Sequence, residues 1–299
     1  MMTRPARRSG TKVDHVDISI GLPNTLTHPG PLMIDWAKRA EERGFTSLST
    51  IDRIVYPTYD TMTALAVAAG ATTRIGLLSG VLLAPLYQPV WLAKAAASLD
   101  AMSGGRLTLG IAVGGRADDF QAMGKDLKNR GRDMDDALET MRRVWAGEHL
   151  AGSDFRTGPP PATPGGVKLL IGGNSDAAVR RTVEYGQGWI AGGGGPEATV
   201  PMITRVRKAW QDAGREGLPR IAALAYFGLG DDEQSRASLR SYYGFLGDWV
   251  DAVVESALRT PQSLRDAVEA YAEAGVDELI LDPTVASLDE VDRAADAVL

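Results

Sequence analysis

The clearest signal for chemistry in the sequence is Gly172-Gly173-Asn174-Ser175, which follows the apolar residues 167–171. Residues 167–171 are typical of a buried strand, and residues 176–185 are expected to form a helix. The free N–H groups in the first turn of a helix attract anions, and Asn174 or Ser175 would cap that turn. The spacing therefore predicts a phosphate site at this strand end, with a simple helix cap as the alternative.

Small residues also mark the ends of other apolar runs. Ser79 and Gly80 interrupt the third run, Gly114 and Gly115 end the fourth, and glycines at 192–195 end the sixth. A turn that requires a positive φ explains any single pair. Glycines at several successive strand ends indicate instead that a planar or phosphorylated ligand approaches the backbone closely.

Polar side chains after the second and fourth apolar runs are the candidate acids and bases. They are Asp52, Tyr56, Tyr59 and Asp119. A carboxyl or phenol group at such a position can deliver or accept a proton. Two alternatives stay open, because Asp119 could cap a short helix and the tyrosines could pack over the mouth of the site.

Composition excludes several other kinds of site. The sequence has no cysteine and only three widely spaced histidines, which excludes thiolate chemistry and argues against a metal site. Neither GxxxxGK[ST] nor a GxGxxG after the first strand is present, so P-loop and Rossmann nucleotide sites are not indicated. Acidic residues outnumber basic ones, 38 to 32, and this balance argues against nucleic-acid binding.

Two segments bear on the location of the protein. Residues 75–93 are uncharged, but Pro85 and Pro89 within them favour a strand, a loop and a helix start over a membrane span. Residues 1–15 are basic and lack the apolar segment of a signal peptide, so they are predicted to be a disordered tail. We therefore expect a cytoplasmic protein that acts on a small-molecule substrate, with neither nucleic acid nor membrane as a partner.

Eight apolar runs alternate with helical patterns along residues 16–299, with no change of composition between the halves. This alternation predicts an α/β fold, a (β/α)8 TIM barrel in a single domain, with insertions after strands 4 and 7. A doubly wound open sheet is the alternative. In such a barrel the active site lies at the carboxyl ends of the strands. The second insertion carries aromatic residues that either wall a substrate pocket or pack between helices, namely Tyr242, Tyr243, Phe245 and Trp249.

Residues 74–124, RIGLLSGVLLAPLYQPVWLAKAAASLDAMSGGRLTLGIAVGGRADDFQAMG, closely resemble the core of the luciferase-like monooxygenase superfamily. Further matches are the PN end of the first strand and the segments MRRVWAGE, LLIGGNSDAAVRRTVEYGQGWIAGGGG and DELILDPTV. The resemblance spans nearly the whole chain. It implies a (β/α)8 barrel that uses FMN or the deazaflavin F420.

The resemblance also implies where the cofactor lies. The ring would rest against a bulge at the end of the third strand, often with a non-prolyl cis peptide, formed here by Ser79, Gly80 and Val81. The ring and the ribityl chain would run along Gly114 and Gly115. The phosphate would be held by Gly172, Gly173, Asn174 and Ser175.

The charged residues near the ring follow from the same resemblance. Asp52 would lie beside the ring and, with Tyr56, is a candidate catalytic residue. Luciferases have a phosphate-binding arginine where this chain has Val113, so Arg53 or Arg116 would supply that charge. Arg53 could instead be an ordinary salt-bridge residue.

The sequence departs from the family at the histidines. Asp52 is followed by Arg53 where F420-using members have histidine, and no other expected strand end carries one. This departure argues against light emission and favours reduction of C=C or C=N bonds, or dehydrogenation. F420 is narrowly favoured over FMN, because the Gly80-Val81 strand end and a composition typical of actinobacteria suit F420-using members. An FMN-dependent monooxygenase and a non-catalytic flavin-binding barrel are the alternatives, and a homodimer is expected because barrels of this family commonly pair.

Overall fold

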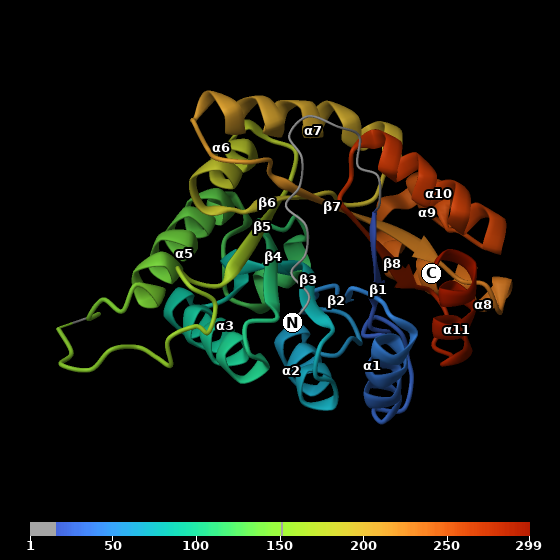
Figure 1. Ribbon diagram of the computed structural model, residues 1–299, viewed down its shortest axis with the longest axis horizontal. Coiled ribbons are helices and arrows are strands. Elements are labelled where there is room, and N and C mark those ends of the chain that lie inside the picture. Colours follow the sequence, from blue (N-terminus) through green and yellow to red (C-terminus); the bar gives the residue numbers. More distant parts are fainter. Residues whose placement is uncertain (1–15, 151) are drawn as a thin grey trace.

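The predicted strands close into a parallel barrel. The computed structural model describes residues 16–150 and 152–299, where eight strands pair in the order β1 to β8 and β8 pairs with β1 (Figure 1). The strands are β1 (Asp17–Gly21), β2 (Ser47–Thr50), β3 (Gly76–Leu83), β4 (Leu107–Ala112), β5 (Lys168–Gly172), β6 (Gly188–Ile190), β7 (Arg220–Phe227) and β8 (Glu278–Pro283). Closure confirms the predicted (β/α)8 fold and excludes the open sheet. The predicted basic tail, residues 1–15, lies outside the described residues.

Helices surround the barrel (Figure 1). They are α1 (Leu32–Arg43), α2 (Thr61–Ala71), α3 (Pro89–Ser103), α4 (Ala117–Ala122), α5 (Arg130–Trp145), α6 (Asp176–Tyr185), α7 (Gly195–Asp212), α8 (Asp232–Tyr243), α9 (Val250–Ser256), α10 (Pro261–Ala274) and α11 (Asp289–Val298). Short 3-10 segments are η1 (Ala84–Leu86), η2 (Leu127–Asn129) and η3 (Gly244–Trp249). The extra segments after β4 and β7 lie where insertions were predicted. Among the helices described, none has the length and apolar character needed to cross a membrane.

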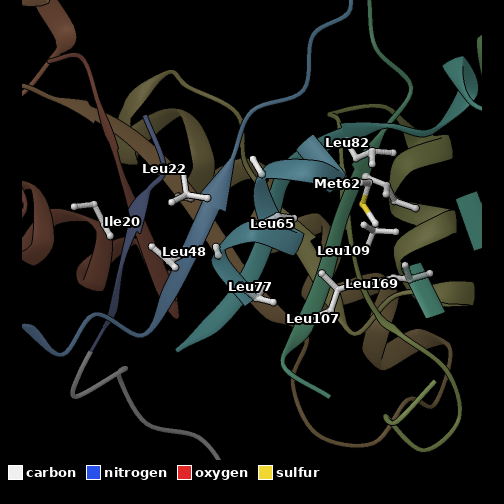
Figure 2. Packing of buried hydrophobic residues seen from close by; sticks show 14 of the residues in the cluster. Ile20, Leu22, Leu48, Met62, Leu65, Leu77, Leu82, Leu107, Leu109 and Leu169 are labelled. Carbon is white, nitrogen blue, oxygen red and sulfur yellow. The ribbon is translucent and has the colours of Figure 1, made fainter. Parts of the chain in front are cut away.

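Alternation along the strands divides the apolar core in two. Leu48, Leu77 and Leu109 join Met62 and Leu65 of α2 in a cluster between the strands and the helices (Figure 2). Side chains of the opposite parity form a second cluster inside the barrel, which includes Leu78, Leu170, Ile190, Leu224 and Ile280. A fully buried leucine or isoleucine stabilises the fold by about 1.5–3 kcal/mol. A one-residue slip of register would move each side chain to the opposite face of the sheet. Because side chains on both faces are packed in a core, that packing opposes such a slip.

A polar network fills the barrel at the amino ends of its strands. Glu278 of β8 is fully buried, and its Oε1 accepts hydrogen bonds from the hydroxyls of Ser19 (2.5 Å) and Ser47 (2.9 Å). Its other oxygen pairs with Arg220 of β7. A buried carboxylate needs this full set of partners. The network fills this end of the barrel, so a ligand would enter from the carboxyl ends of the strands.

The end of β3 departs from a regular strand, as predicted for Ser79, Gly80 and Val81. Pairing with β4 shifts register between Ser79 and Leu82, and the Gly80–Val81 peptide bond is cis. Gly110 of β4 packs against this end so tightly that a Cβ atom there would lie 2.1 Å from the carbonyl oxygen of Ser79. The register shift and the cis bond confirm the predicted bulge and cis peptide. The close approach of Ser79 means that only glycine fits at position 110.

Candidate functional site

The loop after β5 has the features of an anion site. Ser175 is the N-cap of α6, and its Oγ accepts a hydrogen bond from the Ala178 N–H at 3.2 Å, which confirms the predicted cap. Gly173 has a φ of 107°, a conformation that favours glycine. Arg205 of α7 donates a hydrogen bond to the carbonyl oxygen of Asn174 at 3.0 Å. Arg205 also pairs with Asp176. Because Gly173, Asn174 and Ser175 are exposed, the helix start lies where an anion can reach it.

The ends of β3 and β5 meet beside this loop. A Cβ atom at Gly172 would lie 3.5 Å from Cγ1 of Val81 and 3.2 Å from Cβ of Ala112. A Cβ atom at Gly80 would lie 2.8 Å from the Oγ of Ser49, a buried hydroxyl that has no hydrogen-bond partner in the described part of the chain. The residues predicted to support a ring therefore lie next to those predicted to hold its phosphate.

The two glycines after β4 serve different purposes. Gly114 has a φ of 72°, and a Cβ atom there would lie 3.3 Å from the ring of Phe120. Packing against α4 and the turn itself explain this glycine. A Cβ atom at Gly115 would meet no atom of the described residues within 4 Å. Of the two, Gly115 is therefore the one whose backbone faces open space.

Asp52, a predicted catalytic residue, lies buried at the end of β2. Its Oδ1 accepts a hydrogen bond from the hydroxyl of Tyr87 at 2.9 Å, and its Oδ2 accepts one from the Leu83 N–H at 2.9 Å. Burial raises the pKa of Asp52 to about 6, although these two hydrogen bonds oppose the rise. The carboxyl group ties the segment after β3 to the end of β2. Its contacts favour a positioning role, and the predicted catalytic role remains a prediction.

Asp52 is expected to make stability depend on pH between about pH 4 and pH 6. Its pKa of about 6 in the folded protein lies above the unfolded value of about 3.9, so the folded state binds the extra proton. The stabilisation is complete below about pH 4 and is lost as the pH rises to about 6, a total of about 3 kcal/mol. In Asp52→Asn the slope should become shallower by this amount, because Asp282, whose pKa is also raised by burial, still contributes. Urea unfolding at pH 4, 5, 6 and 7 measures it, and parallel curves for both proteins would contradict the assignment.

Arg53 forms a buried ion pair, so its interpretation as a salt-bridge residue is confirmed. Its Nε lies 2.8 Å from Oδ2 of Asp119, and the two side chains are 4% and 0% exposed. Oδ1 of Asp119 accepts hydrogen bonds from the N–H groups of Ile54 and Val55. Asp119 therefore does not cap α4, whose N-cap is Arg116. The Nη1 of Arg53 is buried and has no hydrogen-bond partner among residues 16–150 and 152–299. The guanidinium lies 5.6 Å from the ring centroid of Tyr56 and 5.5 Å from that of Tyr242.

The insertion after β7 reaches across the mouth of the barrel. The hydroxyl of Tyr56 lies 2.8 Å from that of Ser241, and the Tyr56 ring contacts Tyr242 edge to face. The guanidinium of Arg116 lies 4.0 Å from the ring centroid of Phe245. Arg116 also pairs with Asp118 of α4, and its predicted role at the phosphate remains a prediction.

The other predicted aromatic residues divide into two groups. The Tyr243 ring packs against Tyr226, Tyr242 and Phe245, contacts that both a pocket wall and packing within the fold would make. Trp249 is 75% exposed and does not belong to that wall. Tyr59 hydrogen-bonds through its hydroxyl to the carbonyl oxygen of His28, at the rim.

Sequence reasoning missed two residues at the ends of β7 and β8. Tyr226 and Asp282 are register partners on these neighbouring strands, and both are buried. Neither was predicted as a catalytic or cofactor-binding residue. The available signal was the spacing of Glu278, Ile280 and Asp282, which places two carboxyl groups on the inner face of an apolar strand. A cavity lies beside them, lined by Thr25, Leu26, Ile51, Tyr226, Tyr242, Pro283 and Thr284 among others.

Together these residues fit a phosphorylated tricyclic cofactor. Glycines let a flat ring approach the backbone, and the capped start of α6 suits a phosphate. Ser49 Oγ and Arg53 Nη1 are buried polar atoms that could pair with ring heteroatoms. In the part of the chain that the structure describes, no three histidine, aspartate or glutamate side chains gather as metal ligands would.

Comparison of the sequence with known proteins gives a family and several relatives. The sequence model of the luciferase-like monooxygenase family matches residues 25–273. An uncharacterized protein of Mycobacterium tuberculosis is 29% identical over 230 residues, which are 68% of this chain and 80% of that protein. Pyrimidine monooxygenase RutA of Yersinia enterocolitica is 27% identical over 201 residues, 61% of this chain and 53% of the enzyme.

Solved structures share the fold at lower identity. Monooxygenase RslO1 of Streptomyces bottropensis has a TM-score of 0.76 at 22% identity, with 95% of this chain and 96% of that chain covered. An F420-dependent secondary alcohol dehydrogenase has a TM-score of 0.76 at 17% identity, with 95% and 98% covered. Because the family model spans most of the described barrel, the chain belongs to the luciferase-like monooxygenase family.

Proposed function

We propose that the protein is an F420-dependent oxidoreductase, which transfers hydride between the deazaflavin and a small organic substrate. The reaction would reduce a C=C or C=N bond or, in reverse, dehydrogenate the substrate. The observation that carries the proposal is the convergence of Gly80, Gly115, Gly172 and the Ser175-capped start of α6 at one end of a closed barrel. We also propose, from the sequence, a cytoplasmic homodimer.

Different segments of the chain would hold different parts of the cofactor. Ser79, Gly80 and Val81 would support the back of the ring, with Gly114 and Gly115 along its side. The residues from Gly172 to Ser175 and the first turn of α6 would bind the phosphate, and Arg205 holds this loop through the carbonyl oxygen of Asn174 while it pairs with Asp176. Once bound, the cofactor supplies the hydride, and the protein must orient the substrate, exclude water and provide a proton.

Two observations support F420. Two proteins of the same fold, the secondary alcohol dehydrogenase and the tetrahydromethanopterin reductase of Methanopyrus kandleri, are F420-dependent enzymes by name. Sequence relatives occur in mycobacteria, which agrees with the actinobacterial composition that favours F420.

FMN-dependent monooxygenation is the second candidate, because RutA and RslO1 are named as monooxygenases. Anaerobic and aerobic oxidation of the bound reduced cofactor separates the candidates. Reduced F420 that is oxidised by enone or imine acceptors without oxygen supports hydride transfer. Reduced FMN that reacts only with oxygen supports monooxygenation, and a bound reduced cofactor that nothing oxidises indicates a non-catalytic barrel.

Ser175→Ala is expected to weaken binding of the phosphate specifically. Loss of a hydrogen bond to a charged group costs about 1.5 kcal/mol or more, roughly a tenfold loss of FMN or F420 affinity. Affinity for riboflavin, or for the deazaflavin core without phosphate, should not change. The stability loss from the missing cap is about 1 kcal/mol.

Thr260→Ala provides the matched control. Thr260 is the N-cap of α10 and accepts from the Ser263 N–H, just as Ser175 does at α6. We expect a similar loss of stability with no loss of cofactor affinity. Equal loss of affinity for FMN and riboflavin in Ser175→Ala would contradict the phosphate assignment.

A further inference from the structure

A buried carboxyl group lies at the inner end of the candidate site without a counter-ion. Asp282 is 1% exposed, and its Oδ1 has no hydrogen-bond partner among the residues that the structure describes. In the described chain, neither Arg nor Lys forms a salt bridge with it. A buried, unpaired carboxylate is so costly that the group takes up a proton instead. Burial accordingly raises the pKa of Asp282 well above its usual value.

The position of Asp282 is set by β1 and β8. A Cβ atom at Gly21 would lie 2.2 Å from Oδ1 of Asp282, so the carboxyl group fills the space that this glycine leaves. Ile280, two residues earlier on the same face, lies 3.5 Å from the position of a Cβ atom at Gly80. Asp282 is thus one step further towards the mouth of the barrel, on the inner face that β3 shares. Gly80, which is proposed to support the ring, lies at the level of Ile280, so Asp282 lies on the mouth side of that support.

A pair of phenols lies beside this position. Tyr226 is the register partner of Asp282, and on adjacent strands register partners point to the same face of the sheet. The hydroxyls of Tyr226 and Tyr243 lie 2.6 Å apart, and Tyr243 is only partly buried. Three titratable groups lie close enough to interact electrostatically with Asp282, namely the phenols of Tyr226, Tyr242 and Tyr243. Burial raises the pKa of each.

We propose that Asp282 is a neutral carboxylic acid that donates the proton of the reaction, and that Tyr243 and Tyr226 return a proton to it from solvent. The proposal rests on the proposed function. When hydride from the reduced deazaflavin adds to one atom of a C=C or C=N bond, the π electron pair bonds to the Asp282 proton at the other atom. The substrate is reduced, the cofactor is oxidised, and Asp282 is left as a carboxylate. A solvent proton, passed through the two phenols, restores the acid.

The C=O stretch of a protonated carboxyl group in the infrared spectrum tests the assignment. At pH 7 the intact protein should show this band, Asp282→Asn should lose it, and Asp52→Asn should keep it. Addition of F420 or FMN should shift the band, because the group faces the cofactor. A wild-type spectrum without the band, or a band that is unchanged in Asp282→Asn, overturns the proposal.

Exchange into D2O tests the route. The band should shift rapidly in the wild-type protein and more slowly in Tyr226→Phe and Tyr243→Phe, variants that keep the rings and lose the hydroxyls. Exchange at the wild-type rate in both variants overturns the relay. These two variants also keep the test valid if Asp282→Asn does not fold.

Failure of the two proposals can be told apart by a separate binding titration. If the wild-type protein shows the band but binds neither cofactor, the proposed function is wrong and the donor role falls with it. If a cofactor binds and leaves the Asp282 band unmoved, the oxidoreductase proposal stands and the donor assignment is wrong.

Discussion

Replacing Arg53 with methionine is expected to destabilise the protein by about 3–5 kcal/mol, because it leaves a buried charge without its partner. Asp119 is 0% exposed, and Arg53 is the cation 2.8 Å from it. The two N–H groups that bond to Oδ1 of Asp119 hold its position but do not neutralise its charge. Urea unfolding at pH 7 gives the free-energy change.

Arg116→Met is the control for this experiment. Arg116 also pairs with an aspartate, Asp118, but the two side chains are 22% and 39% exposed. Solvent screens such a pair, and its loss together with the Phe245 contact should cost about 1 kcal/mol. A loss in Arg53→Met no larger than in Arg116→Met would show that Asp119 does not depend on Arg53.

Gly110→Ala is expected to damage both the fold and the cofactor site. The new Cβ atom would lie 2.1 Å from the carbonyl oxygen of Ser79, a backbone atom that cannot rotate away. The end of β3 must therefore move, and with it Gly80 and Val81. Overpacking of this kind costs about 1–3 kcal/mol. Since the same residues are proposed to support the ring, affinity for F420 and FMN should fall about tenfold or more.

Gly70→Ala separates this effect from a general effect of glycine replacement. Gly70 lies in α2, and a Cβ atom there would meet no atom of the described chain within 4 Å. Alanine favours the helix over glycine by up to about 1 kcal/mol, so stability should rise or stay level while cofactor affinity is unchanged. A Gly110→Ala protein that binds the cofactor as tightly as Gly70→Ala would show that the end of β3 does not contact the ring.

The barrel could be predicted because its signals are local. Each apolar run is short enough for a strand, and each is followed by a helical pattern, so counting them gives the fold. The cap at Ser175 could be predicted for the same reason, since a cap depends on residues within one turn of the chain. The bulge at Ser79, Gly80 and Val81 was found through resemblance to a family, because nothing in its residue types alone specifies it.

The contacts that define the site could not be predicted, because they join distant parts of the chain. Arg53 pairs with Asp119, 66 residues later, and whether Arg53 binds a ligand or a carboxylate depends on that contact. In the sequence, nothing distinguishes Asp282 from other acidic residues. Only the closed barrel shows that its carboxyl group lies against Gly21. These facts follow from register and packing, which the types of neighbouring residues in the sequence do not encode.

The path of the chain through the insertion after β7 could not be predicted from the sequence either. Its aromatic residues suggested a wall, but Phe245 and Trp249 could not be told apart by type. In the fold, Phe245 is 52% exposed and lies over Arg116, while Trp249 is 75% exposed. The kink at Gly247, with a φ of 58°, separates the two. Only the path of the chain after this kink decides which ring reaches the mouth of the barrel.

Titration of the purified protein with F420 and with FMN, followed by absorbance and fluorescence, tests the proposed cofactor site. We expect saturable binding of one F420 per chain, weaker binding of FMN, and loss of both in Gly110→Ala but not in Gly70→Ala. Tight binding of FMN without binding of F420 would contradict the choice of cofactor. Failure of the wild-type protein to bind either would contradict the assignment of the glycine-rich strand ends as a cofactor site.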